Sequence, residues 1–256
     1  MPRGEINLSR ARGAKAQRRA NSTHYEPQVE NTIDFHQAVK VKRRSIELRP
    51  KTLAQETLVA SLLNPDTSIT VAVGPAGSGK SYLAMLAAMR ALREGECDRI
   101  ILTRPAVGVE EEEHGFLPGT LVQKMEPWTR PLLDIIKEFY HPREVLGLLE
   151  DEVIEISPLA YMRGRTFKNA WIVADEMQNA TPNQIKMLLT RIGEGSRIVV
   201  TGDVEQADRT TANNGLIDLC ERLKHQGVRG IDLCKLGSRD IQRHPIIDNV
   251  LKLYSE

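Results

Sequence analysis

The chain has 256 residues, of which 41% are apolar and 27% charged, ordinary values for a globular protein with a buried core. No run approaches eighteen consecutive apolar residues and no apolar segment follows the basic amino terminus, so we expect neither a membrane-spanning helix nor a secretory signal. Cys97, Cys220 and Cys234 are scattered without metal-ligand spacing, which favours a cytoplasmic protein and gives no indication of zinc.

The net charge of +1 conceals an uneven distribution along the chain. Residues 1–51 contain 12 Lys or Arg and 5 Asp or Glu, so the remainder is acidic. We expect residues 1–45 to form a basic, weakly structured extension and residues 46–256 to form one domain. The extension can be a solvated tail or an arm that binds nucleic-acid phosphates, and composition does not decide between them.

From Arg49 onward, candidate strands alternate with candidate helices, which predicts an α/β fold with a parallel sheet and helices on both faces. The predicted strands are 69–73, 99–103, 153–157, 170–174 and 197–201, with 228–235 as a further candidate. The predicted helices are 52–63, 79–93, 120–139, 182–192, 213–226 and 245–254. Residues 108–119 contain four consecutive glutamates and are expected to form a mobile acidic loop.

The first predicted strand runs directly into a complete phosphate-binding loop. The loop residues are Gly74, Pro75, Ala76, Gly77, Ser78, Gly79, Lys80 and Ser81. Its glycines let the backbone curl so that several N–H groups point at one anion. Lys80 brings a charge to the β- and γ-phosphates, and the Ser81 hydroxyl suits Mg²⁺. The helix predicted from here on, which includes Tyr82, adds a favourable dipole, so residues 74–82 are predicted to bind a nucleoside triphosphate.

Hydrolysis requires a metal ligand and a base in addition to the loop. Asp175 and Glu176 follow the apolar strand predicted at 170–174, and such strand ends open onto the ligand crevice of an open α/β sheet. We expect Asp175 to hold Mg²⁺ through a water molecule beside Ser81, and Glu176 to polarise the attacking water. A strand that simply ends in two solvated acids is the alternative.

Two glutamines are candidates for contact with the nucleotide. Gln206 follows the strand predicted at 197–201 and can contact the γ-phosphate, although Gly202-Asp203 is also common turn chemistry. Gln55, at the start of the helix before the loop strand, has the donor and acceptor that read an adenine edge. Alone it is a weak signal, because glutamines are common at helix starts.

Together, these motifs resemble the PhoH-like family of phosphate-loop ATPases over roughly residues 48–254. Beyond the loop, the resemblance rests on Thr-Arg-Pro-Ala at 103–106, Gly-Phe-Leu-Pro-Gly at 115–119, Ser-Pro-Leu-Ala-Tyr-Met-Arg-Gly-Arg-Thr at 157–166, Asp-Glu-Met-Gln-Asn at 175–179, Thr-Gly-Asp-Val-Glu-Gln at 201–206 and Arg-His-Pro at 243–245. The segment 157–166 is the most distinctive of these motifs.

The family is similar to the first RecA-like domain of superfamily 1 helicases. The resemblance implies adenine contact at Gln55, nucleic-acid contact near Thr103 and Arg104, and γ-phosphate sensing at Gln206. It implies ATP and Mg²⁺ as cofactors and RNA or single-stranded nucleic acid as the partner. Some relatives also carry a nuclease domain, but its carboxylate cluster is not found in this sequence.

Helicases of that group take a catalytic arginine from a second RecA-like domain, for which the roughly fifty residues after Gln206 leave no room. Such an arginine contributes about 10³–10⁵ in rate. We therefore expect a neighbouring subunit to supply it in a head-to-tail ring, and the family resemblance suggests six subunits. The candidates are Arg163, Arg165 and Arg243, each of which can alternatively pair with a surface acid.

The leading hypothesis is a Mg²⁺-dependent, helicase-like ATPase that binds or remodels RNA or single-stranded nucleic acid. The alternative is an ATP-controlled oligomeric switch or assembly protein that uses no nucleic acid. Stimulation of hydrolysis by RNA would separate the two. A small-molecule kinase fits less well, because Glu176 directly after Asp175 indicates activation of water.

Overall fold

Strands and helices alternate along the chain in the computed structural model. The structure describes residues 44–105, 121–206, 214–242 and 246, without the side chains of 121–128. The strands are β1 (Ile69–Val73), β2 (Arg99–Thr103), β3 (Ile154–Ile156), β4 (Ala170–Ala174), β5 (Arg197–Gly202) and β6 (Ile231–Lys235). The helices are α1 (Leu53–Leu63), α2 (Lys80–Glu94), α3 (Leu121–Lys137), α4 (Pro142–Glu150), α5 (Pro182–Leu189) and α6 (Gly215–His225). Short 3-10 turns are η1 (Leu159–Met162), η2 (Met177–Asn179) and η4 (Ser238–Asp240).

The strands form one parallel sheet in the order β3-β2-β4-β5-β1-β6. Because all strands run the same way, every segment that follows a strand leaves the sheet at one edge, the carboxyl edge. The strand β5 separates β1, which leads into the phosphate loop, from β4, which leads into the acid pair. This topology confirms the predicted α/β, RecA-like phosphate-loop fold class.

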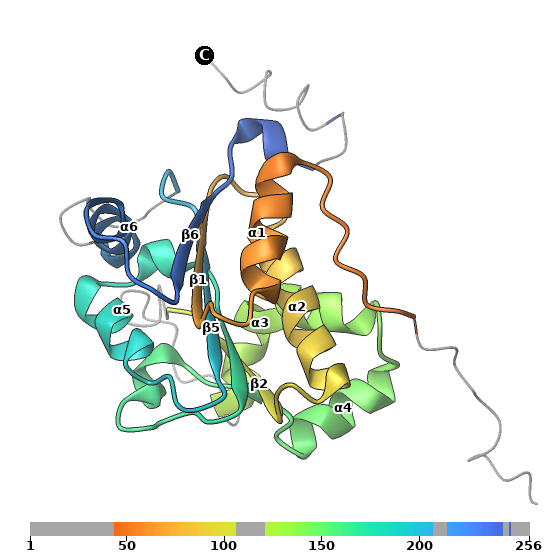
Figure 1. Cartoon of the computed structure of the whole chain (residues 1–256). Helices are drawn as coiled ribbons and strands as arrows, with labels where there is room; N and C mark the ends of the chain where they lie inside the picture. Colours follow the sequence, from red (N-terminus) through yellow and green to blue (C-terminus); the bar gives the residue numbers. More distant parts are fainter. Residues whose placement is uncertain (1–43, 106–120, 207–213, 243–245, 247–256) are drawn as a thin grey trace, which may run out of the picture. The chain divides into compact units, whose positions relative to one another are not determined.

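Successive side chains of the strands point into two separate cores. On one face, Leu102 and Val173 pack with apolar side chains of α1 to α4. On the other face, Ile101 and Ile172 pack with α5, α6 and the turn η1. The predicted coverage of both faces is therefore confirmed, and it explains why strands such as β1 are buried along their whole length (Figure 1).

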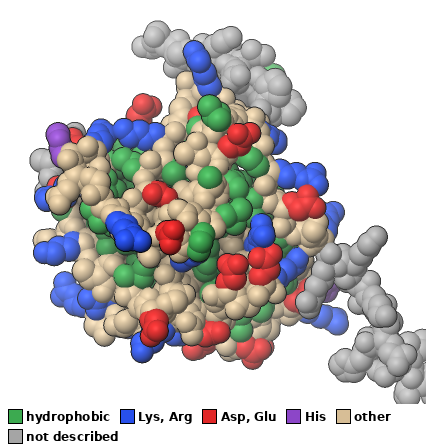
Figure 2. Space-filling model, in the orientation of Figure 1, with side chains coloured by type: hydrophobic (Ala, Val, Ile, Leu, Met, Phe, Trp, Pro, Cys, Tyr) green, Lys and Arg blue, Asp and Glu red, His purple; other side chains and the backbone are tan. Residues whose placement is uncertain are grey.

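The surface is mixed in charge: Figure 2 shows basic and acidic side chains interspersed over the face of the protein seen in Figure 1. Among the helices that the structure describes, none has the length and apolar character needed to cross a membrane.

All six predicted strands are present, with the last starting at Ile231 and not at 228. The sequence did not predict α4. Its start is fixed by His141 as cap, by Pro142 in the first turn, and by the bond that the His141 N–H donates to the Glu144 carboxylate. Three predicted segments lie outside the described residues. They are the extension at 1–45 apart from residues 44 and 45, the acidic loop at 108–119, and the helix at 245–254 apart from residue 246.

Candidate nucleotide-binding site

The phosphate loop ends where α2 begins, at Lys80. The residue before it, Gly79, has φ 88°, and no side chain caps the helix. The first turn of α2 contains no acidic residue. Because the first N–H groups of a helix have no partner within the helix, this uncapped end is available to an anion.

Neighbouring segments hold the loop by its backbone. The amide nitrogen of Gln55 donates to the Ser78 carbonyl at 2.9 Å, and the backbone N–H of Gln242 donates to the Gly77 carbonyl at 2.8 Å. The N–H of Ala76 donates to the Asp203 carboxylate at 3.0 Å. Segments before β1, after β5 and after β6 thus fix one loop, and this preorganises it for phosphate.

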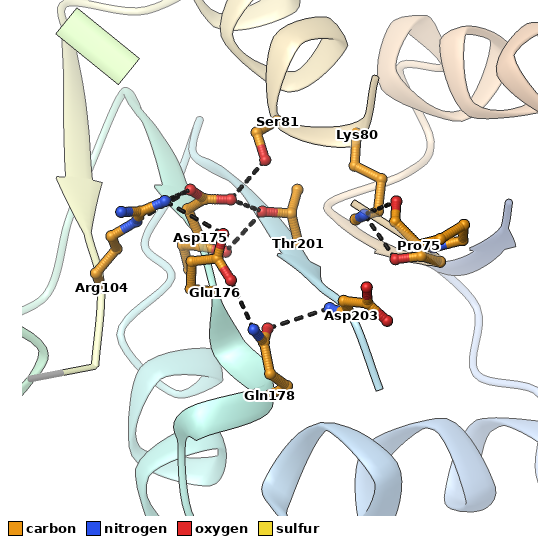
Figure 3. Close-up of polar contacts among 11 residues, drawn as sticks. Pro75, Lys80, Ser81, Arg104, Asp175, Glu176, Gln178, Thr201 and Asp203 are labelled. Carbon is orange, nitrogen blue, oxygen red and sulfur yellow. Dashed lines mark hydrogen bonds and ion pairs between the residues drawn. The ribbon is translucent and has the colours of Figure 1, made fainter. Parts of the chain in front are cut away.

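Lys80 is buried against the loop, with 7% of its surface exposed. Its ammonium donates to the carbonyls of Gly74 and Pro75 at 2.6 and 2.8 Å. The charge is therefore held among the loop residues, and its contact with a phosphate stays a prediction (Figure 3).

Asp175, at the end of β4, uses its two carboxylate oxygens differently (Figure 3). Its Oδ1 accepts hydrogen bonds from the hydroxyls of Ser81, at 2.6 Å, and Thr201. Its Oδ2 accepts from Nε and Nη2 of Arg104 at 3.0 and 2.6 Å. The structure thereby brings together Ser81 and Asp175, the two residues predicted to hold the metal.

Glu176 lies beside it in a left-handed backbone conformation, with φ 55° and ψ 36°. For a residue other than glycine this costs about 1–3 kcal/mol, and such conformations cluster at functional sites. Its carboxylate accepts from Gln178 Nε2 at 2.6 Å and from Arg104 Nη2 at 3.3 Å. The side-chain oxygen of Gln178, Oε1, accepts from the Asp203 N–H at 3.1 Å, so Glu176 is linked through Gln178 to the end of β5.

A cavity of about 240 Å³ lies between the phosphate loop and the acid pair. Its lining residues are Ala76, Gly77, Gly79, Lys80, Ser81, Tyr82, Asp175, Glu176, Gly202, Asp203 and Gln206. Carboxylate and hydroxyl oxygens are the ligands that Mg²⁺ prefers, and the lysine with the helix N-terminus suits phosphate. The donor set therefore fits a magnesium nucleotide.

The two glutamines have different surroundings. Gln206 is exposed and lines the cavity, and its contact with a γ-phosphate stays a prediction. Gln55 is only 3% exposed; its carbonyl oxygen accepts from the Lys51 N–H at 2.7 Å, and its nitrogen holds Ser78. Gln55 thus supports the loop in this structure, and its adenine contact stays a prediction.

Tyr82 is partly exposed at the same cavity. Its hydroxyl donates to Glu138 at 3.1 Å, and burial together with this bond raises the pKa of the tyrosine.

The two residues predicted to contact nucleic acid both bond to the acid pair, Thr103 through its backbone and Arg104 through its side chain. The Thr103 side chain is 0% exposed, and within the described residues its hydroxyl has no hydrogen-bond partner. A buried side chain does not fit the predicted nucleic-acid contact, and Thr103 instead accepts the Asp175 N–H through its carbonyl at 3.0 Å. Arg104 keeps 15% of its side chain exposed while it binds Asp175 and Glu176.

The three candidate arginines for a neighbouring site also differ. Arg165 binds Glu155, with Nη2 2.8 Å from Oε2, and stacks over the Phe167 ring at 4.5 Å. Arg163 is exposed, and Arg243 lies outside the described residues.

Thr201, Gln178 and Asp203 are site residues that the sequence reading did not assign. All three are at least 95% buried and lie in the motifs that follow β4 and β5. Each is a polar residue in a motif that also contains a predicted site residue, and this is the sequence signal that could have identified all three.

A parallel sheet whose phosphate loop faces an aspartate and a glutamate across one intervening strand defines a phosphate-loop NTPase-like protein. The family model described as PhoH-like protein matches residues 47–255. The chain therefore belongs to the PhoH-like family.

Curated relatives agree with this assignment. A PhoH-like protein of Synechocystis sp. is 43% identical over 83% of this chain, and one of Bacillus subtilis is 41% identical over 87%. The chain spans 63% and 68% of those two relatives' own lengths. Protein PhoH of Escherichia coli is 33% identical over 96% of this chain and 72% of its own length.

Two solved structures are similar to part of the chain. The Pyrococcus furiosus Hef helicase domain matches at a TM-score of 0.42 and 14% identity, over 73% of this chain and 38% of that one. The Sulfolobus solfataricus SWI2/SNF2 ATPase core in complex with dsDNA matches at 0.38 and 17% identity, over 61% and 32%.

Proposed function

We propose that this protein binds and hydrolyses ATP with Mg²⁺ and couples hydrolysis to RNA or single-stranded nucleic acid. The observation that carries the proposal is the 2.6 Å hydrogen bond between Ser81 Oγ and Asp175 Oδ1. It joins the loop to the acid strand beside the lysine and the glutamate that the reaction needs. The family membership and the RecA-like topology support the same function.

Each residue has a distinct role in this proposal. The N–H groups at the uncapped start of α2 and the Lys80 ammonium bind and orient the phosphates. Ser81 and Asp175 would hold Mg²⁺, which supplies charge neutralisation at the phosphates when bound. Glu176, with 46% of its side chain exposed, orients a water molecule and accepts its proton, while Gln178 keeps the carboxylate in place.

We also propose that the protein forms a head-to-tail ring of six subunits, because none of the described arginines other than Arg104 contacts the acid pair. A cytoplasmic location is proposed because its three cysteines are free thiols in the structure. Arg163, Arg165 and Arg243 are the candidates for completing a neighbour's site. Analytical ultracentrifugation with ATP present tests the ring. A monomer mass that does not change with concentration would exclude it.

The central experiment measures ATP hydrolysis by the full chain with Mg²⁺, with and without single-stranded RNA and DNA. Lys80→Ala is expected to abolish nucleotide binding. Glu176→Gln is expected to retain binding and lose hydrolysis, because the amide accepts no proton. Normal turnover by Glu176→Gln would show that another group is the base. A basal rate that neither polymer changes would favour the nucleotide-controlled assembly protein instead.

A further inference from the structure

The motif at 157–166 is the most distinctive in the sequence, yet none of its residues lines the nucleotide cavity. It forms the turn η1, which two apolar side chains anchor in the core: Leu159 is 2% exposed and Met162 is 0% exposed. Between and beside these anchors, Tyr161 is 61% exposed and Arg163 is exposed. The turn therefore presents an aromatic ring and a cation to solvent from a fixed base.

The rest of the motif holds this arrangement in place. Arg165 pairs with Glu155 and stacks over Phe167, so the nearby acid is already neutralised. Gly164, with φ 80°, makes the backbone reversal between the two arginines. In the described part of the chain, Arg163 itself has no ion pair, which leaves its charge available to a ligand.

A groove of about 340 Å³ adjoins this turn. Ala160, Arg163, Asn183, Gln184 and Met187 line it, the last three from α5. None of these lining residues is acidic, and Lys186, also exposed, lies on the same helix three residues after Asn183. The groove thus combines positive charge with side-chain amides that donate and accept hydrogen bonds.

The turn follows β3, so it lies at the carboxyl edge of the sheet, the same edge as the nucleotide cavity. The Ser157 N–H pairs with the Leu102 carbonyl at 2.9 Å and ties the turn to the end of β2. Arg104 follows β2 and binds the acids after β4. The turn and the acid pair are therefore connected through one intervening strand end.

We propose that Tyr161, Arg163 and the adjoining groove form a contact site for single-stranded nucleic acid. The Tyr161 ring stacks on an unpaired base, which is sequence-tolerant because every base has a π-face. Arg163 and Lys186 bind backbone phosphates, and Asn183 bonds to a base edge or sugar. This proposal assigns Arg163 to the polymer and leaves Arg165 and Arg243 as the candidates for completing a neighbouring subunit's site. The proposal rests on the proposed function and assigns its polymer-binding residues.

The test measures fluorescence anisotropy of labelled single-stranded RNA and DNA of roughly 12 nucleotides, titrated with the full chain at several salt concentrations. Tyr161→Ala is expected to weaken binding about tenfold, and Tyr161→Phe to stay within about twofold of the unsubstituted protein. Arg163→Gln is expected to reduce the salt-dependence slope by about 0.7. Arg229→Gln, an exposed arginine before β6 at the opposite edge of the sheet, is the matched control and should bind normally.

The outcomes separate this site from the proposed function. If the unsubstituted protein binds nucleic acid but Tyr161→Ala and Arg163→Gln bind equally well, the contact lies elsewhere and this inference is overturned alone. If the unsubstituted protein binds neither RNA nor DNA, both proposals fail. Basal ATP hydrolysis by Tyr161→Ala should equal that of the unsubstituted protein, and a weakened affinity with an unchanged basal rate supports the site. The RNA and DNA arms identify the preferred polymer.

Discussion

Arg104 and Asp175 are joined by two hydrogen bonds to a single carboxylate oxygen, from Nε at 3.0 Å and Nη2 at 2.6 Å. The opposite oxygen of Asp175 is thereby left to the hydroxyls of Ser81 and Thr201 (Figure 3). Because Asp175 is almost completely buried, its charge needs this guanidinium. Arg104 therefore positions Asp175, the proposed metal ligand, from the neighbouring strand end.

Replacement of Arg104 should reduce metal affinity more than nucleotide affinity. For Arg104→Gln we expect the Mg²⁺ concentration at half-maximal hydrolysis to rise about 10–100-fold, the usual effect of losing a residue that orients a metal ligand. For Arg104→Lys the required Mg²⁺ concentration should lie between that of the unsubstituted protein and that of Arg104→Gln. Lysine keeps the positive charge but cannot bond to the carboxylate at two points. Mn²⁺ binding followed by electron paramagnetic resonance gives a second readout. An unchanged metal dependence in both variants would show that Arg104 does not position Asp175.

Gln178 should affect turnover without affecting nucleotide binding. Its amide bridges the Glu176 carboxylate and the Asp203 N–H, and it lines no part of the nucleotide cavity. We expect Gln178→Ala to lower kcat about tenfold with little change in KM for ATP, because the base loses its orientation. Steady-state kinetics measure both constants, with the exposed Gln226→Ala as control. A rise in KM at constant kcat would contradict the positioning role.

The fold was largely readable because its signals are local. Each buried strand is a short apolar run, and the loop between β1 and α2 is a contiguous motif. The omission of α4 has a local cause as well, since only nine residues carry it and its start depends on a cap at His141. Periodicity is weak over so short a helix.

The site was readable only in part, because its geometry depends on contacts between distant residues. The pairing of Arg104 with Asp175 spans 71 positions, and no local pattern specifies it. The burial of Thr103 follows from its place at the end of an inner strand with neighbours on both sides. Residue type predicted a chemistry for the loop and the acids, whereas the packing of the strand ends decides which polar groups meet.

Gly74→Ala should destabilise the protein strongly. A Cβ at this position would lie 2.4 Å from the Leu236 carbonyl oxygen, and the backbone has φ 152°. Clash and strain together should lower the free energy of unfolding by about 2–5 kcal/mol, or roughly 5–15 °C in Tm. Gly95→Ala, at φ 74° with nothing within 4 Å, isolates the strain alone and should lose only about 1 kcal/mol. Equal melting temperatures for the two variants would contradict the close contact at Gly74.

The thiol of Cys97 should make stability fall in alkaline solution. Cys97 is 4% exposed, and burial raises its pKa from 9.0 to about 11. The folded state therefore keeps the proton that the unfolded chain releases. The thiol's contribution to the free energy of unfolding is complete below pH 9 and is lost as the pH rises through 11. Urea unfolding at about pH 8 and about pH 10.5 should show that the stability advantage over Cys97→Ala shrinks at the higher pH. Cys220 and Cys234, whose pKa values burial also raises, are present in both proteins and cancel in the comparison. A difference that stays constant between the two pH values would mean that the thiol ionises equally in the folded and unfolded chain.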